Sequence, residues 1–153
     1  MTLELTMPLA PYRIDTEIAT LSPEAPLILV ADDHADSRYI ARIVLENAGF
    51  RVVEARTGRE ALVIAQVERP DAIMLDIVMP ELTGWEVARA IRADHTTPRP
   101  AIIAVTALSG LADHEMSLAA GCDEMLVKPV HPRSLVRVVR RYVQARAVDR
   151  SAG

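Results

Sequence analysis

Four short apolar segments of this 153-residue chain are each followed by a side chain that can take part in chemistry. Asp32 and Asp33 follow residues 27–31, Asp76 follows 72–75, Thr106 follows 101–105, and Lys128 follows 124–127. A short apolar run between turn residues is typical of a buried strand. A carboxylate at the end of such a strand has no packing role, because burying an unpaired charge is costly. The spacing therefore predicts one polar pocket that these strand ends share.

Three carboxylates in one pocket repel one another and require a cation. Hard oxygen ligands with room for water suit Mg²⁺. A zinc site is a poor alternative, because Cys122 is the single cysteine and the four histidines lack ligand spacing. His34 lies beside the acidic pair, but a surface or packing role is favoured for it over a role in the site.

Phosphoryl transfer to a carboxylate is the reaction that this set of side chains favours. An aspartate can act as a nucleophile and hold a phosphoryl group as an acyl phosphate. Asp76 is the expected acceptor because it is central, whereas Asp32 and Asp33 are expected to hold the metal. Lys128, the only lysine, and the hydroxyl of Thr106 would neutralise phosphoryl oxygens, as a loose transition state requires.

The elements that position these residues alternate along the chain. Residues 51–55 are typical of a fifth strand, and helices are expected near 35–48, 57–68, from 83, near 111–120 and over 132–147. Thr57 with Glu60 and Thr83 with Glu86 have the spacing of a capping box. Gly49 and Gly121 suit left-handed helix ends.

Alternating strands and helices predict an α/β fold with a parallel sheet covered on both faces. The favoured architecture is a flavodoxin-like (βα)5 three-layer sandwich with strand order 2-1-3-4-5. In this order the first and third strands are neighbours, so that Asp32, Asp33 and Asp76 converge at one edge.

Helical periodicity predicts which faces of the helices pack inward. The expected apolar positions of the first helix are Ile40, Ile43, Val44 and Ala48, and those of the last are Leu135, Val138, Val139, Tyr142 and Val143. The fourth helix has the poorest apolar stripe and is expected to be the loosest. Packing is the expected role of Trp85.

Composition places the chain among cytoplasmic globular proteins. Half of its residues are hydrophobic, a quarter are charged, and the net charge of −4 argues against nucleic acid as the main partner. No apolar run is long enough to span a membrane and no secretion signal is evident. We expect an N-terminal arm at 1–26, one domain at 27–147 and a tail at 148–153. The arm is either a flexible tail or, through alternating Leu3, Leu5 and Met7, a strand that pairs with a sheet edge or a neighbouring subunit.

The order Asp32-Asp33, Asp76 with Met79-Pro80, Thr106-Ala107 and Lys128-Pro129 resembles the receiver domain of two-component response regulators, in particular the stand-alone chemotaxis-regulator type. The resemblance covers residues 27–147. It implies that Asp76 is phosphorylated by a histidine kinase or a histidine phosphotransfer protein.

The resemblance also assigns roles to individual positions. Asp33 matches the direct Mg²⁺ ligand, Asp32 an acid acting through water, and the backbone carbonyl of Val78 a further ligand beside Asp76. Thr106 matches the switch hydroxyl. Lys128 matches the phosphate-pairing lysine, and its bond to Pro129 should be cis.

Two departures from the family pattern carry expectations. Met125 stands where the family usually has Tyr or Phe, and Met cannot make the two-position ring flip, so activation should reach the surface by another route, such as the fourth helix. Val78 and Leu108, two residues beyond Asp76 and Thr106, cannot orient water. We therefore expect slow self-dephosphorylation.

The favoured function is a single-domain response regulator, either a phosphorelay shuttle or an output regulator. It is not an enzyme in the ordinary sense and signals through altered protein–protein contacts with an unknown target. A homodimer is one option. Arg133, Arg137, Arg140 and Arg141 form either a solvated face of the last helix or a contact for an acidic partner or second subunit. The alternatives are a Mg²⁺-dependent aspartyl phosphatase, disfavoured by Val78, and a receiver-like binding or dimerisation module without phosphotransfer.

Overall fold

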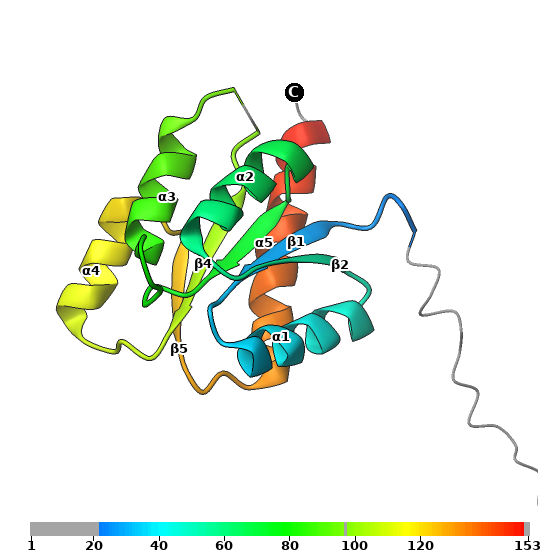
Figure 1. Ribbon diagram of the computed structural model, residues 1–153. Helices are drawn as coiled ribbons and strands as arrows, with labels where there is room; N and C mark the ends of the chain where they lie inside the picture. The colour runs from blue at the N-terminus through cyan, green and yellow to red at the C-terminus, as the bar shows by residue number, and fades with distance from the viewer. Residues whose placement is uncertain (1–21, 97, 152–153) are drawn as a thin grey trace, which may run out of the picture.

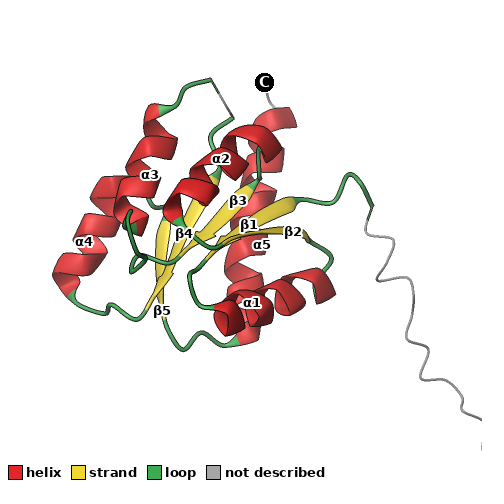
Figure 2. Cartoon of the chain, viewed as in Figure 1, coloured by secondary structure: helices red, strands yellow, loops and turns green. Residues whose placement is uncertain are grey.

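The computed structural model describes residues 22–96 and 98–151, over which five strands alternate with five helices (Figures 1 and 2). In chain order they are β1 (Leu27–Ala31), α1 (Ala35–Asn47), β2 (Arg51–Ala55), α2 (Gly58–Glu68), β3 (Ala72–Leu75), α3 (Gly84–Ala93), β4 (Ala101–Thr106), α4 (Leu111–Ala120), β5 (Glu124–Val127) and α5 (Pro132–Ser151). Two ends differ from the expectation. Strand β4 includes Thr106, and α5 continues through four of the six residues that were assigned to the tail.

The five strands form one parallel sheet in the order β2-β1-β3-β4-β5, which confirms the predicted flavodoxin-like fold. Ala31 of β1 pairs with Leu75 of β3. Asp32 and Asp76 are the next residues of these two chains, so the register alone brings them to the same point of the carboxyl edge. Every residue of β1, β3 and β4 is buried, because helices cover both faces of the sheet.

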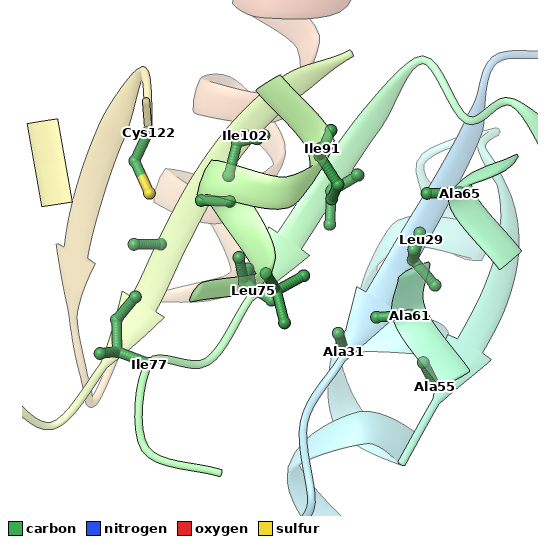
Figure 3. Packing of buried hydrophobic residues seen from close by; sticks show 14 of the residues in the cluster. Leu29, Ala31, Ala55, Ala61, Ala65, Leu75, Ile77, Ile91, Ile102 and Cys122 are labelled. Atoms are coloured by element: carbon green, nitrogen blue, oxygen red, sulfur yellow. The ribbon is translucent and has the colours of Figure 1, made fainter. Parts of the chain in front are cut away.

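The helices lie in two layers, with α1 and α5 on one face of the sheet and α2, α3 and α4 on the other (Figure 1). Successive strand residues point to opposite faces. In β1, Ile28 and Val30 pack toward α1 and α5, whereas Leu29 and Ala31 pack toward α2 and α3. Figure 3 shows the second cluster, in which Leu29 faces Ala61 and Ala65 of α2. Two cores therefore clamp the central strands.

Local signals set the helix ends much as predicted. The Thr57 hydroxyl accepts a hydrogen bond from the Glu60 N–H, and Thr83 forms a full capping box with Glu86. Gly49 and Gly121 have φ of 96° and 103°, which favour glycine. The predicted stripe of α5 is also confirmed, since Leu135, Val138, Val139 and Val143 are buried and Tyr142 packs at the margin.

The predicted inward face of α1 is partly wrong. Ile40 is 60% exposed and Ile43 is also exposed, whereas Ala41 and Leu45 are buried. The helix is rotated because Arg38 is buried, and its guanidinium donates a hydrogen bond to the Asp32 carbonyl at 2.8 Å. Periodicity therefore identified the helix, but the polar contact of Arg38 decided which side faces the sheet.

The predicted strand at Leu3, Leu5 and Met7 lies outside the described residues, and so does most of the predicted arm. Among the helices that the structure describes, none combines the length and the apolar character that crossing a membrane requires.

Gly84 determines how closely α3 approaches the carboxyl end of β3. A Cβ atom at this position would lie 2.3 Å from the Asp76 carbonyl oxygen and 2.8 Å from the Ile77 Cα. Gly84→Ala should therefore lower the free energy of unfolding by about 3 kcal/mol, at the upper end of overpacking costs. Denaturant unfolding measures this change.

Gly110→Ala is the matched control, because its added Cβ would meet the movable carboxylate end of Asp113 instead of backbone. It should cost much less. Equal stability of Gly84→Ala and the wild type would contradict the close approach of α3 to Asp76.

Candidate functional site

Backbone hydrogen bonds beyond the strand ends hold the predicted site residues at one edge of the sheet. The Asp32 N–H donates to the Ala55 carbonyl at 3.2 Å, and the Asp76 N–H donates to the Ala31 carbonyl at 2.9 Å. The Lys128 N–H donates to the Thr106 carbonyl at 2.8 Å. The bond from Lys128 to Pro129 is cis, as the resemblance implied.

The ammonium of Lys128 joins the two central carboxylates. Its Nζ lies 2.8 Å from Asp32 Oδ2 and 3.2 Å from Asp76 Oδ2. The lysine side chain is 28% exposed, so it spans the floor of the pocket and does not extend into solvent. Lys128 pairs with two of the three carboxylates, so with Asp33 included the group of side chains keeps an excess of negative charge.

Asp33 supplies the direct structural sign that a cation fits here. Among the residues that the structure describes, its Oδ1 atom is buried without a hydrogen-bond partner. Oxygen atoms of Asp32, Asp33 and Asp76 and a nitrogen of His34 all lie within 4.8 Å of one another. An unsatisfied buried carboxylate oxygen in a cluster of hard donors matches what Mg²⁺ needs.

The loop after β3 shapes the surroundings of Asp76. Its Oδ1 accepts a hydrogen bond from the Val78 N–H at 3.1 Å, and the Gly84 N–H donates to the Ile77 carbonyl at 2.8 Å. Ile77 and Met79 are buried, whereas Val78 is 56% exposed. The buried residues on both sides of Val78 anchor the loop, and the apolar Val78 side chain is left exposed two residues beyond Asp76.

Thr106 is fully buried, and its hydroxyl accepts a hydrogen bond from the Leu108 N–H at 3.3 Å. The structure places Thr106 at the same edge, on the strand between those of Asp76 and Lys128. Its distance from the Lys128 backbone is set by strand pairing. The switch role that was predicted for its hydroxyl is not tested by this geometry.

The sequence reasoning missed a polar contact between α3, α4 and β5. Trp85 Nε1 donates to Ser117 Oγ at 2.9 Å, and Ser117 Oγ donates to Met125 Sδ at 3.4 Å. Ser117 is fully buried. This contact joins α3, α4 and β5 at the position where the family pattern departs. The poor apolar stripe of α4 was its only sequence signal.

Burial and charge shift the pKa values of the two central groups. Burial raises the pKa of Asp76, and the charge of Asp32 raises it further, although Lys128 lowers it. Burial lowers the pKa of Lys128, but hydrogen bonding to Asp32 and the charges of both carboxylates outweigh that effect and leave it raised. The Lys128 ammonium therefore stays charged, whereas ionisation of Asp76 is made less favourable by its surroundings.

One hollow adjoins the site, and a second lies between two helices. A pocket of about 420 Å³ includes Asp32, Asp76 and Lys128 in its lining and continues over apolar residues beneath α1. A larger groove of about 730 Å³ lies between α1 and α5 and is lined by the predicted arginine face, Arg133, Arg137, Arg140 and Arg141. Arg140 lies over the Phe50 ring and Arg141 pairs with Glu124, so part of this face is used within the domain.

Comparisons with known proteins agree on one family. The family model described as the response regulator receiver domain matches residues 28–140. The probable transcriptional regulator ycf27 of Cyanophora paradoxa is 40% identical over 113 residues, which are 74% of this chain and 46% of that protein. An uncharacterised 14.6 kDa protein of Leptolyngbya boryana is 36% identical over 118 residues, covering 77% of this chain and 90% of the relative.

Solved structures give the same result. The chemotaxis protein CheY4 of Vibrio cholerae matches with a TM-score of 0.73 and 32% identity, covering 77% of this chain and 98% of that one. The chain spans about half the length of the transcriptional regulators that it matches.

The raised pKa of Asp76 predicts that Asp76→Asn stabilises the domain near neutral pH. The folded state binds the Asp76 proton more tightly than the unfolded chain does, so ionisation costs stability as the pH rises through the folded pKa. The gain from asparagine should be present above this raised value and fade as the pH falls toward the ordinary value of 3.8. Denaturant unfolding across this pH range measures it.

Glu115→Gln, on the exposed side of α4, is the control and should show no such pH-dependent gain. An Asp76→Asn protein that is less stable than the wild type at every pH would contradict the electrostatic account.

Proposed function

Given that this chain belongs to the response regulator receiver family, we propose that it receives a phosphoryl group on Asp76 and changes its protein contacts as a result. The observation that carries the proposal is the shared lysine: Lys128 Nζ bridges Asp32 and Asp76 while Asp33 Oδ1 keeps no hydrogen-bond partner among the described residues. The Lys128 ammonium supplies one positive charge, and the remaining carboxylate oxygens could bind a metal cation.

Asp33, Asp76 and the Val78 carbonyl would bind Mg²⁺ directly, and Asp32 would act through water. When bound, the ion supplies charge neutralisation at the phosphoryl oxygens. The protein itself contributes by positioning the Asp76 carboxylate. The Val78 N–H holds one oxygen of Asp76 and Lys128 holds the other, so the carboxylate is fixed before the donor arrives.

The donor would be a phosphohistidine of a histidine kinase or a phosphotransfer protein. A carboxylate oxygen of Asp76 forms the new P–O bond, the P–N bond breaks, and the donor imidazole leaves with the bonding electron pair and takes up a proton. The negative charge of Asp76 then moves outward onto the phosphoryl oxygens. Lys128 can follow this charge because its ammonium is shared with Asp32 and not bound to one partner.

Thr106, together with the hydrogen-bonded contact of Trp85, Ser117 and Met125, would carry the change to the surface. The Thr106 hydroxyl would give up its hydrogen bond from the Leu108 N–H and turn toward the phosphoryl group. Met125 fills the place of the usual aromatic side chain and is bound to Ser117 of α4. Ser117 therefore offers a route from β5 to α4, which agrees with the expectation that the fourth helix responds.

The output would be a protein contact in the cytoplasm, with a histidine kinase or a phosphotransfer protein as the source of the signal. Some relatives are named as transcriptional regulators and are about twice as long as the matched segment. An aspartyl phosphatase remains disfavoured, because the exposed apolar Val78 stands where such an enzyme places an acid.

Treatment with a small acyl-phosphate donor and Mg²⁺ tests the acceptor directly. Intact mass should show one added phosphoryl group on the wild type and none on Asp76→Asn, since only Asp76 is held by both Lys128 and the Val78 N–H. Asp113→Asn on α4 is the control and should react like the wild type. Undiminished labelling of Asp76→Asn would rule out Asp76 as acceptor.

Slow hydrolysis of the acyl phosphate is expected from the two apolar residues near it. Val78 is exposed and Leu108 packs against the core, and neither can orient water. The phosphorylated protein should persist for minutes or longer in Mg²⁺. Val78→Glu should shorten the lifetime by roughly tenfold or more, since even modest general base assistance has that effect.

The lifetime is followed by loss of the added mass, with Val67→Glu on the exposed side of α2 as the control. A wild-type lifetime of seconds, or a Val78→Glu protein that hydrolyses no faster, would show that these side chains do not limit hydrolysis.

A further inference from the structure

His34 occupies a position that its fold role does not explain. It is the N-cap residue of α1, where Ser, Thr, Asn or Asp would bond to the first helical N–H groups. Within the described structure its imidazole makes no such capping bond. The ring is turned toward the acidic pair, although its side chain is 70% exposed and has open solvent on the other side.

The imidazole nitrogen lies between two carboxylates. Its Nδ1 is 3.1 Å from Asp33 Oδ1 and 3.4 Å from Asp32 Oδ1. The first of these oxygens is the buried atom without a hydrogen-bond partner described above. In an octahedral site with metal–ligand distances near 2.1 Å, neighbouring ligands lie about 3.0 Å apart. The Nδ1–Oδ1 distance therefore matches two ligands on one edge of an octahedron.

We propose that His34 supplies a nitrogen ligand to the cation of this pocket, and that the site consequently prefers a first-row transition divalent cation such as Mn²⁺ or Co²⁺ over Mg²⁺. The inference rests on the proposed phosphoacceptor site, because it uses the same carboxylates. Its basis is the donor set: the oxygens of Asp33 and Asp76 suit both Mg²⁺ and Mn²⁺, whereas an added imidazole nitrogen favours a transition cation over Mg²⁺, which takes oxygen ligands.

The position of His34 keeps this ligand available. Its backbone N–H donates to Asp32 Oδ1 at 2.9 Å, which fixes the start of α1 against the acidic pair. The exposed ring can release and rebind an ion from solvent without opening the core. His34 lies against Oδ1 of Asp32 whereas Lys128 lies against Oδ2, so a nitrogen ligand from His34 would leave the lysine free for the phosphoryl group.

The competing explanation makes the opposite prediction. If His34 acted only as a cation paired with Asp32 and Asp33, it would compete with metal for these carboxylates. Replacing it would then tighten the binding of every divalent cation. If it is a ligand, replacing it weakens transition-metal binding and leaves Mg²⁺ binding nearly unchanged.

The test is metal binding by the full chain without any phosphodonor. Mn²⁺ titration followed by electron paramagnetic resonance, with Mg²⁺ as competitor, gives both dissociation constants for the wild type, His34→Gln and His95→Gln. His95 is exposed beyond the end of α3, at the opposite edge of the sheet, and is the matched control. His34→Gln should weaken Mn²⁺ binding by about tenfold or more. Its Mg²⁺ affinity should change by less than about twofold.

Pulsed paramagnetic resonance of bound Mn²⁺ supplies a second readout. The wild type and His95→Gln should show a coupled ¹⁴N nucleus that His34→Gln lacks. A wild type without nitrogen coupling, an unchanged Mn²⁺-to-Mg²⁺ ratio in His34→Gln, or tighter Mn²⁺ binding by that variant would each overturn the inference while leaving Asp76 as the acceptor. A wild type that binds neither ion would overturn the inference and the proposed metal site together.

Discussion

The structure depends on three carboxylates being held at one sheet edge with a single ammonium between them. Burying like charges together is unfavourable unless opposite charge or a bound cation offsets it. Lys128 offsets part of this cost for Asp32 and Asp76, and Asp33 keeps a buried oxygen without a hydrogen bond among the described residues. The domain can therefore fold with these carboxylates in place, although the pocket still lacks enough positive charge to balance them. That deficit suits the pocket to hold a cation.

The parallel sheet brings these carboxylates together. The pairing of Ala31 with Leu75 places Asp32 beside Asp76, and the cores on both faces prevent the strands from sliding apart. Gly84 lets α3 approach the Asp76 carbonyl closely, so the helix start supports the same loop. The sheet and its two cores thus hold like charges side by side, although electrostatic repulsion opposes that arrangement.

Much of this fold could be predicted because its signals are local. Apolar runs marked the strands, and the Thr83 capping box marked the start of α3. The rest depended on contacts between distant elements. Buried Arg38 rotates α1 by bonding the Asp32 carbonyl, and Ser117 joins Trp85 to Met125 across three elements. A sequence pattern carries neither contact, because each needs the tertiary arrangement to form.

The central claim is that Lys128 changes partners when Asp76 carries a phosphoryl group. A crystal structure with Mg²⁺ and beryllium trifluoride, a stable phosphoryl mimic, tests it most directly. We expect beryllium trifluoride on Asp76, the ion held by Asp33, and Lys128 Nζ moved from Asp32 Oδ2 to a fluorine at about 3 Å. Beryllium trifluoride on another carboxylate, or Lys128 still bridging Asp32 and Asp76 beside a filled site, would contradict it.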